Sequence, residues 1–283
     1  MHLSPPPRAV PSSLQIVNFF NPLAQVGWAL LGFGTVFFWG FVMNADLSFL
    51  TFRGPYVVVD GKVTEVEETG ASVNEQRVRA NHYEYSVAGV RHTGTSYSHG
   101  SGASVGEIVP VEYAESDPSQ SRIEGMRRAM FPAGVVFVAI LPLVGVTLLI
   151  VAMRSGLRRN HLLREGLLAM GTLKSKKATN MRVNKQRVYE LCFEFTARDG
   201  RRCEAKTRTS RTELLENEEQ EPLLYDPDDP RRAYLLDEAP ARPELEQNGD
   251  LRGRPVSAML SIILPLIVIV AHGAYLLFKL GIL

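Results

Sequence analysis

Ser104 is the centre of the best match to a catalytic pattern in this chain. The run Gly102-Ala103-Ser104-Val105-Gly106 fits the G-x-S-x-G pattern of a nucleophilic serine. That pattern requires a strand before the serine, a helix after it and a large sheet that holds acidic and histidine partners. Here the sequence predicts a strand after the serine, in a domain too small for such a sheet. We therefore interpret the run as a solvated hairpin loop, and we expect no catalytic residue.

Three histidines and two cysteines are the remaining candidates for metal or redox chemistry. His82, His92 and His99 could ligate a metal ion, but His82 and His92 fall on separate predicted strands without an accompanying carboxylate pattern. Scattered surface histidines are the better interpretation, with metal binding as a minor hypothesis. Cys192 and Cys203 have neither C-x-x-C spacing nor a histidine partner, which predicts free, partly buried thiols. We expect no metal and no cofactor.

His272 stands apart because it lies within an apolar segment, with Tyr275 three residues further on the same helical face. An imidazole inside a membrane span costs free energy unless it faces protein or water. One hypothesis is a proton or ion relay, and the alternative is a packing hydrogen bond to a neighbouring helix. No acidic residue lies in an apolar segment to complete a relay, which favours packing. His272 and Tyr275 are the candidate intramembrane polar site.

Three apolar segments, residues 26–43, 129–153 and 256–280, would have to position that site. The first two contain no ionisable residue, and His272 is the only one between residues 256 and 278. About 20 helical residues cross a hydrocarbon core about 30 Å thick, so we predict three transmembrane helices. Buried helices of a soluble core are the alternative, but the intervening sequence offers no large helical domain. Membrane insertion makes the lipid bilayer the first predicted partner.

The N-terminal segment, residues 1–25, lacks a charged region that runs into an apolar stretch. We therefore expect no cleavable signal peptide, and the first span is predicted to be an uncleaved anchor. Apolar residues between Leu14 and Phe20 predict a short interfacial helix that ends at Asn21-Pro22.

Overall charge and its distribution limit the function and the orientation. The 283 residues contain 31 basic and 30 acidic side chains, for a net charge of +1, so we predict no nucleic-acid partner. Eight arginines flank the spans on one side and five basic residues on the other. The positive-inside rule then predicts a cytoplasmic N-terminus and a cytoplasmic 154–255 region, in the plasma (inner) membrane. Those arginines are Arg8, Arg154, Arg158, Arg159, Arg164, Arg242, Arg252 and Arg254.

The two regions between the spans, residues 44–128 and 154–255, resemble each other. Similar residues recur in the same order about 110 positions apart, and each region is followed by a span with Ile-Leu-Pro-Leu. The matched pairs are Gly61/Gly171, Tyr83/Tyr189, Gly89/Gly200, Tyr113/Tyr225 and Pro118/Pro230. We predict a duplicated unit of one β domain and one helix.

Alternating apolar residues predict that both regions are small antiparallel β-sheet or barrel domains, so the fold class is an α+β membrane protein. Tyr83, Tyr85 and Val87 form one apolar face, and Tyr189 to Phe195 alternate in the same way. Asp199-Gly200 predicts a two-residue hairpin turn. With that turn, Cys192 faces Thr207 and Cys203 faces Thr196.

Two further local predictions follow from turn and strand chemistry. Pro110 within the strand 107–113 is expected at a sheet edge, because proline cannot donate to a ladder. Ser210 with Glu213 predicts a capping box that opens a short helix through about residue 219.

These turn and strand residues together resemble the bacterial domain-of-unknown-function 3592 family. The first copy carries Gly61-x-Val, Tyr83-x-Tyr85-x-Val87-x-Gly89 and Val111-x-Tyr113-x-x-x-x-Pro118. The second carries Phe193-x-Phe195-x-x-x-Asp199-Gly200 and Leu224-Tyr225-Asp226-Pro227-x-x-Pro230. The resemblance implies a membrane-tethered small β domain in bacteria, and it supplies no catalytic residues. The second copy departs from the pattern by a charged insert between Thr212 and Glu221.

The leading functional prediction is a non-enzymatic integral membrane scaffold or accessory protein. Its two β domains would bind an as yet unidentified protein partner, and self-association into a homo-oligomer is a further option. One alternative is an oligomeric ion channel or transporter subunit. The other, a membrane-anchored enzyme, is the least favoured because no assembled catalytic constellation is evident in the sequence.

Overall fold

The structure is a computed structural model that describes residues 3–216, 218–238 and 243–282. The chain divides into two compact units. Phe33–Pro142 form one, which we call the β1–β5 unit, and Met1–Gly32 with Leu143–Leu283 form the other, the β6–β10 unit. Two helices, α2 (Pro22–Gly40) and α4 (Ile140–Glu165), cross the boundary between them.

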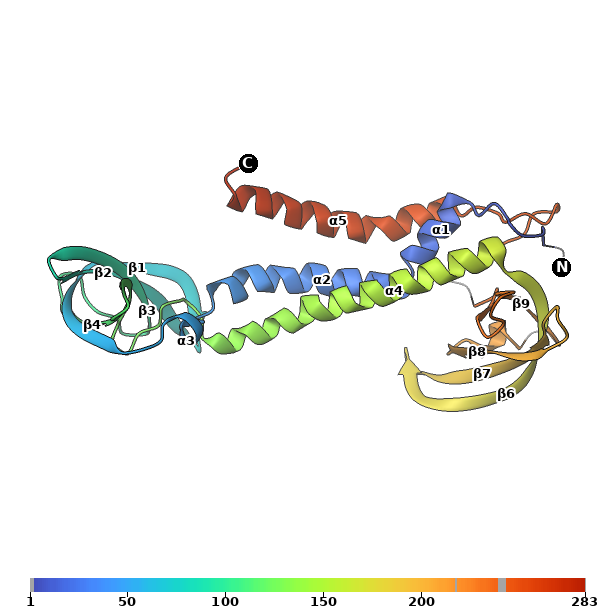
Figure 1. The fold of residues 1–283 in the computed structure, drawn as a ribbon, viewed down its shortest axis with the longest axis horizontal. Coiled ribbons are helices and arrows are strands. Elements are labelled where there is room, and N and C mark those ends of the chain that lie inside the picture. Colours follow the sequence, from blue (N-terminus) through green and yellow to red (C-terminus); the bar gives the residue numbers. More distant parts are fainter. Residues whose placement is uncertain (1–2, 217, 239–242, 283) are drawn as a thin grey trace. The chain divides into compact units, whose positions relative to one another are not determined.

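The β1–β5 unit contains a five-stranded antiparallel sheet with strand order β3-β2-β1-β4-β5. The sheet curls until its edges meet (Figure 1), and the backbone N–H groups of Tyr97 and Arg127 donate to each other's carbonyls at 2.8 and 3.1 Å. Its strands are β1 (Tyr56–Val73), β2 (Gln76–Val87), β3 (Val90–His99), β4 (Ile108–Ala114) and β5 (Asp117–Ile123). Short helices flank the sheet: η1 (Val42–Asn44), α3 (Ser48–Thr51) and η2 (Ala133–Ala139).

The core of this sheet follows from alternation along β2. Tyr83 and Tyr85 are buried side chains on one face, packed with Val63 and Val111 from the neighbouring strands. The Tyr83 hydroxyl lies 2.9 Å from the Ser121 hydroxyl, so a buried polar group keeps a partner. The predicted apolar face of this region is therefore confirmed.

The β6–β10 unit contains a second five-stranded antiparallel sheet, with strand order β10-β9-β6-β7-β8. Its core is built from Leu191, Phe193 and Phe195 on β7, as the alternation predicts. Read from its other edge, the order β8-β7-β6-β9-β10 is the same as that of the first sheet. The strands are β6 (Leu167–Val183), β7 (Gln186–Thr196), β8 (Arg202–Thr209), β9 (Glu221–Tyr225) and β10 (Ala233–Leu235).

The two sheets also share their irregularities. In the first sheet the β1/β2 register shifts between Val63 and Glu65, and in the second the β6/β7 register shifts between Leu173 and Ser175. A second shift follows in each, where a threonine hydroxyl donates across to a valine carbonyl: Thr69 to Val78 at 2.9 Å and Thr179 to Val188 at 2.8 Å. Both hairpins then turn at two residues with positive φ, Asn74-Glu75 and Asn184-Lys185. β-bulges are specific features of a sheet, so the two sheets match in detail as well as in order.

Three helices are long and apolar enough to cross a membrane: Pro22–Asn44, Ala133–Glu165 and Pro255–Lys279. They contain the three segments predicted as spans, apart from the first residues of the second segment and the last residue of the third. The second helix continues past Met153 to Glu165, so its final turns occupy residues that the sequence placed in the β domain. The α+β class with two antiparallel sheets is confirmed.

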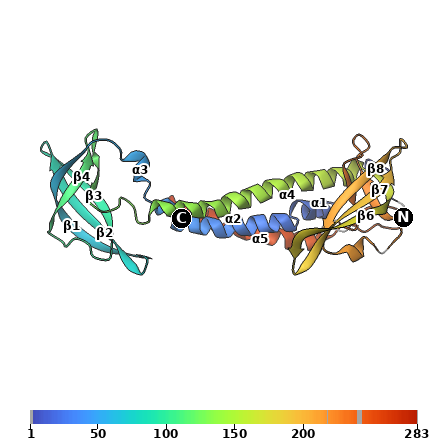
Figure 2. The same ribbon diagram turned by 90° about the horizontal axis from the view of Figure 1, so that it is seen from below.

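The second sheet shares a core with the helices of its own unit. Leu14 and Val17 of α1 (Ser12–Phe19), Leu163 of α4 and Ala258 of α5 (Pro255–Lys279) pack with Leu224 of β9. Helix α1 lies beside α4 and α5 (Figure 2), and the Asn18 side chain donates to Asn160 Oδ1 at 2.7 Å. The β6–β10 sheet is therefore joined to these helices by buried apolar contacts.

The predicted register of the β7–β8 hairpin is wrong by one residue. Cys192 faces Lys206 and Cys203 faces Phe195. Arg198-Asp199-Gly200 form a three-residue loop in which Ala197 N donates to Arg201 O and Gly200 has φ of 83°. The glycine takes the left-handed position that a three-residue hairpin loop requires, a geometry that the two-residue interpretation overlooked.

Three other local predictions also need correction. Pro110 is not on an edge strand, because it lies on β4, between β1 and β5. It is placed opposite Glu124, just past the last residue of β5. There the Glu124 N–H donates to the Pro110 carbonyl at 2.9 Å, so the missing proline N–H is not needed. The helix expected after Ser210 is only η3 (Thr212–Leu214). By strand register, Tyr83 corresponds to Phe193 rather than Tyr189.

Candidate functional site

His272, the residue that the sequence singles out, contacts the backbone of a neighbouring helix. Its Nε2 lies 3.0 Å from the carbonyl oxygen of Gly32 on α2, and because a carbonyl can only accept, Nε2 carries the proton. A Cβ added to Gly32 would lie 2.6 Å from Val268 Cγ2. Glycine therefore lets α2 and α5 approach closely at the point where the imidazole bonds. Tyr275, three residues further on, is half-buried.

The structure does not bring the other sequence candidates together. Ser104 lies in the loop that leads into β4, so a strand and not a helix follows it. Its backbone N–H donates to Glu107 Oε2 at 2.7 Å. His82 Nδ1 is 3.0 Å from the Thr95 hydroxyl, and His92 stacks on Tyr85. Within the described part of the chain, no three histidine, cysteine or acidic residues are placed to hold a metal ion.

His99 has a third kind of environment. Its Nε2 accepts a hydrogen bond from Arg127 Nη1 at 3.1 Å. Burial and the nearby Arg127 charge lower the pKa of His99, so the ring is neutral at physiological pH. His82, His92 and His99 thus each make a separate local contact, and they do not come together at one site.

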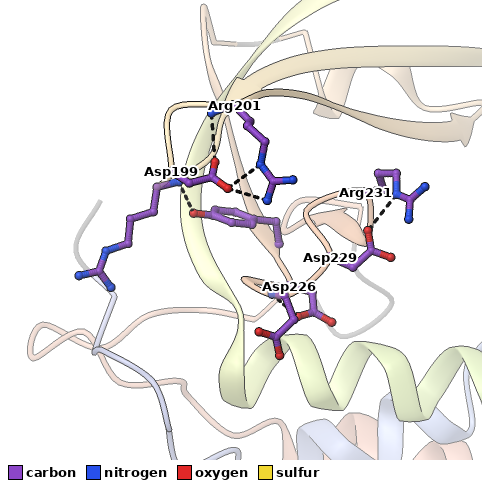
Figure 3. Close-up of polar contacts among 8 residues, drawn as sticks. Asp199, Arg201, Asp226, Asp229 and Arg231 are labelled. Carbon is purple, nitrogen blue, oxygen red and sulfur yellow. Dashed lines mark hydrogen bonds and ion pairs between the residues drawn. The ribbon is translucent and has the colours of Figure 1, made fainter.

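Residues that carry the family resemblance in the second sheet meet at two turns, shown in Figure 3. The Tyr225 hydroxyl accepts a hydrogen bond from Arg198 N at 2.8 Å, which joins the end of β9 to the β7–β8 loop. Asp199 binds Arg201 of the same loop, and Asp229 binds Arg231, so each carboxylate is held within its own turn. These bonds lower the pKa of Asp199 and of Asp229. The residues that carry the resemblance in this sheet therefore stabilise its turns.

A cavity of about 570 Å³ lies between α4 and the second sheet, and we call it the α4–β8–β10 cavity. From α4 it is lined by Ser155, Arg158, Arg159 and Leu162. Spacing of i, i+3, i+4 and i+7 places these four on one helical face. The remaining lining residues are Glu190 of β7; Ala205, Lys206, Thr207 and Arg208 of β8; Ala233, Tyr234 and Leu235 of β10; and Glu238.

Positive charge predominates in this cavity. Arg208 pairs with Glu190, with Nη2 and Oε2 2.7 Å apart, and Lys206 Nζ lies 3.5 Å from Glu204 Oε2. Arg158 and Arg159 make no hydrogen bond or ion pair with the residues that the structure describes. Two guanidinium groups, with their planar sets of donors, are thus available to a ligand.

Two partly buried side chains modify the polarity of the cavity. Glu238 accepts a hydrogen bond from the Thr207 hydroxyl, and burial raises the pKa of Glu238 to about 7 against the opposing influence of Arg159. Near neutral pH about half of this carboxyl is therefore uncharged. The Tyr234 hydroxyl is buried, and the described residues offer it no hydrogen-bond partner. Burial also raises the pKa of Tyr234, so it remains a donor.

This arrangement can bind an anion that has several acceptor oxygens. Sequence reasoning used Arg158 and Arg159 only as charges that orient the chain. Their spacing with Ser155 and Leu162 marks a helical face, but only the folded sheet places β8 and β10 opposite that face.

The chain matches no family model, and no curated protein and no solved structure shows significant similarity to it.

Proposed function

We propose that the chain is a non-enzymatic scaffold or accessory protein of a bacterial inner membrane, anchored by α2, α4 and α5. The observation that carries the proposal is that two sheets of the same strand order and bulge pattern are combined with three helices long enough to span a bilayer. In this proposal the repeated domains present surfaces to protein partners.

Internal duplication is part of the proposal. Each hairpin has a β-bulge, at Val63 in one and at Leu173 in the other, and a threonine hydrogen bond, at Thr69 and at Thr179. The bulge and the threonine are separated by the same number of residues in both hairpins. Bulges are placed by particular residues rather than by the general requirements of a sheet, so independent origins would not be expected to repeat them.

The proposed topology follows from connectivity and charge. Helix α4 runs from the end of the first β region to Glu165, directly before β6 begins at Leu167. A single crossing by α4 assigns the two sheets to opposite sides of the membrane, and the basic residues assign the β6–β10 sheet to the cytoplasm. That sheet and its helices share an apolar core. This suits a scaffold, because a partner bound to the sheet would be held firmly to the membrane anchor.

Thiol labelling in sealed vesicles tests this topology. Single cysteines replace Ser101 and Glu218, both exposed, in a background with Cys192→Ala and Cys203→Ala. In right-side-out vesicles, an impermeant maleimide should label position 101 at once and position 218 only after permeabilisation. Equal labelling of both positions before permeabilisation would contradict the proposal.

Copurification in mild detergent from the native host tests the scaffold role. A specific partner retained with the wild type and lost when one sheet is deleted is expected. Ion flux through liposomes containing only this chain, together with no retained partner, would overturn the scaffold in favour of the channel alternative.

A further inference from the structure

We propose that the α4–β8–β10 cavity binds the phosphate group of an acidic membrane lipid, with Arg158 and Arg159 as its principal ligands. This inference depends on the proposed function in one respect, that α4 crosses the membrane. The charge, shape and polar groups of the cavity are independent of that assumption.

The first argument is the availability of the two arginines. The two basic side chains that the second sheet contributes to the cavity are paired with acidic side chains, Arg208 with Glu190 and Lys206 with Glu204. Arg158 and Arg159 lack such partners in the described chain although they face the same cavity. Guanidinium groups bind phosphate oxygens in a bidentate manner. An anion that enters the cavity can therefore accept hydrogen bonds from two guanidinium groups without breaking an existing ion pair.

The second argument is the buried hydroxyl of Tyr234. A buried donor without a partner is rare in a folded protein, because it loses its bonds to water. Tyr234 is one of the residues that line the cavity, and it lies close enough to Arg159 for the two to interact electrostatically. A phosphate oxygen held by Arg159 would supply the missing acceptor.

The third argument is the position of the arginines along α4. The apolar part of the helix ends at Met153, and Arg158 and Arg159 follow within two turns, about 7–9 Å further along the axis. The polar headgroup region of a bilayer begins just beyond the hydrocarbon core. A span that ends near Met153 therefore brings both arginines to the depth of lipid phosphates, where basic pockets recognise anionic headgroups. A volume of about 570 Å³ is within the usual range for small-ligand cavities.

The test uses the full chain in nanodiscs of phosphatidylcholine alone or with phosphatidylglycerol, and native mass spectrometry counts retained lipid. Wild type should retain phosphatidylglycerol selectively. The double variant Arg158→Gln/Arg159→Gln should lose at least tenfold in this retention. A matched variant, Arg154→Gln/Arg164→Gln, removes the same charge from α4 outside this cavity and should keep it. Equal losses in both variants would overturn the proposal in favour of general attraction to an anionic surface.

Tyr234→Phe separates binding from folding. Removing an unpartnered buried hydroxyl should leave the thermal stability of the lipid-free chain unchanged or raised, yet weaken lipid retention severalfold. Unchanged retention in this variant would show that the hydroxyl does not meet the ligand and would overturn the proposed binding pose.

Free phosphates identify the source of the anion. Inorganic phosphate and glycerol 1-phosphate, titrated in detergent, should bind far more weakly than phosphatidylglycerol. Comparable affinity that also depends on Arg158 and Arg159 would assign the cavity to a soluble phosphate compound and overturn the lipid assignment. Thiol labelling at residues 101 and 218 reports the membrane topology separately, so failure of the lipid site and failure of the proposed function give different results.

Discussion

The guanidinium group of Arg8 caps the C-terminal end of α4, with Nη1 2.7 Å from the carbonyl oxygen of Leu163. Its Nη2 also donates to the Gly166 carbonyl, and Arg8 as a whole is only 7% exposed. The last carbonyls of a helix have no partner within the helix, and a cation at that end also interacts favourably with the helix dipole. One residue of the N-terminal segment therefore completes a helix that begins far along the chain.

Arg8→Ala should destabilise the β6–β10 unit by about 2–4 kcal/mol, because at least two buried carbonyls lose their donor. Thermal unfolding of the purified chain in mild detergent measures this. Arg8→Lys keeps the charge but not the planar donors and should recover only part of the loss. The exposed Arg91 provides the control, and Arg91→Ala should be nearly neutral. Equal stability of Arg8→Ala and the control would contradict the capping role.

Alternation and apolar length predicted the elements, since both leave a direct trace in the sequence. Phe193 and Phe195 mark a core-facing strand by their spacing alone. The register was less accessible, because the choice between a two- and a three-residue loop at Asp199 depends on a backbone angle at Gly200. That one-residue difference moved every cross-strand pair of β7 and β8.

The site depended on contacts that no local pattern reveals. Arg8 and Leu163 are distant in sequence and meet only when the N-terminal segment packs on α4. Arg159 and Tyr234 approach each other only when the second sheet docks on that helix. For His272, the sequence offered two interpretations, and the glycine that accepts its bond belongs to a different helix. The sequence identified His272 as unusual but could not assign it a partner.

Gly61→Ala and Gly171→Ala should have parallel effects on the two sheets. An added Cβ would lie 2.5 Å from Val111 Cγ2 at Gly61 and 2.8 Å from Leu223 Cδ2 at Gly171. Overpacking of this kind costs about 1–3 kcal/mol, and both variants should lower the apparent Tm. Gly134→Ala, which has open space around it, is the matched control. A neutral effect at either sheet position would show that the two cores are not equivalent there.

Cys192 and Cys203 should remain reduced with respect to each other. Cys192 pairs with Lys206, so Cys203 lies three residues further along β8, roughly 10 Å at about 3.3 Å per residue. An odd offset also places the two side chains on opposite faces, whereas a disulfide needs Cα atoms within about 7 Å. Maleimide labelling after denaturation without reductant should count two thiols. In the native chain Cys192 should react slowly, because burial raises its pKa. An oxidised pair would refute the observed register.

Glu221 should make the β6–β10 unit less stable as the pH rises from about 5 to 8. Its side chain is buried, and burial together with the nearby Asp237 raises its pKa to about 7. A folded-state pKa above the unfolded value means that the native state binds the extra proton, so stability is fully present at low pH and falls through this window. Glu221→Gln should flatten the decline and raise the apparent Tm at pH 8 by roughly 2–5 °C.

The comparison with wild type is needed because other groups titrate in the same range. Glu238 contributes a decline of the same sign, whereas His99, whose pKa is lowered, contributes stability that increases with pH. Measuring the difference between Glu221→Gln and wild type at each pH removes both contributions. A difference that does not change between pH 5 and 8 would show that Glu221 does not titrate there.

His272 provides the last prediction, because the packing and relay hypotheses give opposite results for one pair of variants. In the packing hypothesis, Nε2 donates to the Gly32 carbonyl and stabilises the α2–α5 contact by about 0.6–1.7 kcal/mol. His272→Ala should then lower the apparent Tm in detergent, while His272→Gln, which keeps an amide donor, should recover much of it. A relay instead requires a group that gains and loses a proton, which glutamine cannot do. Proton flux in liposomes should therefore be equally low for wild type and both variants; flux present in wild type and abolished by His272→Gln would establish the relay.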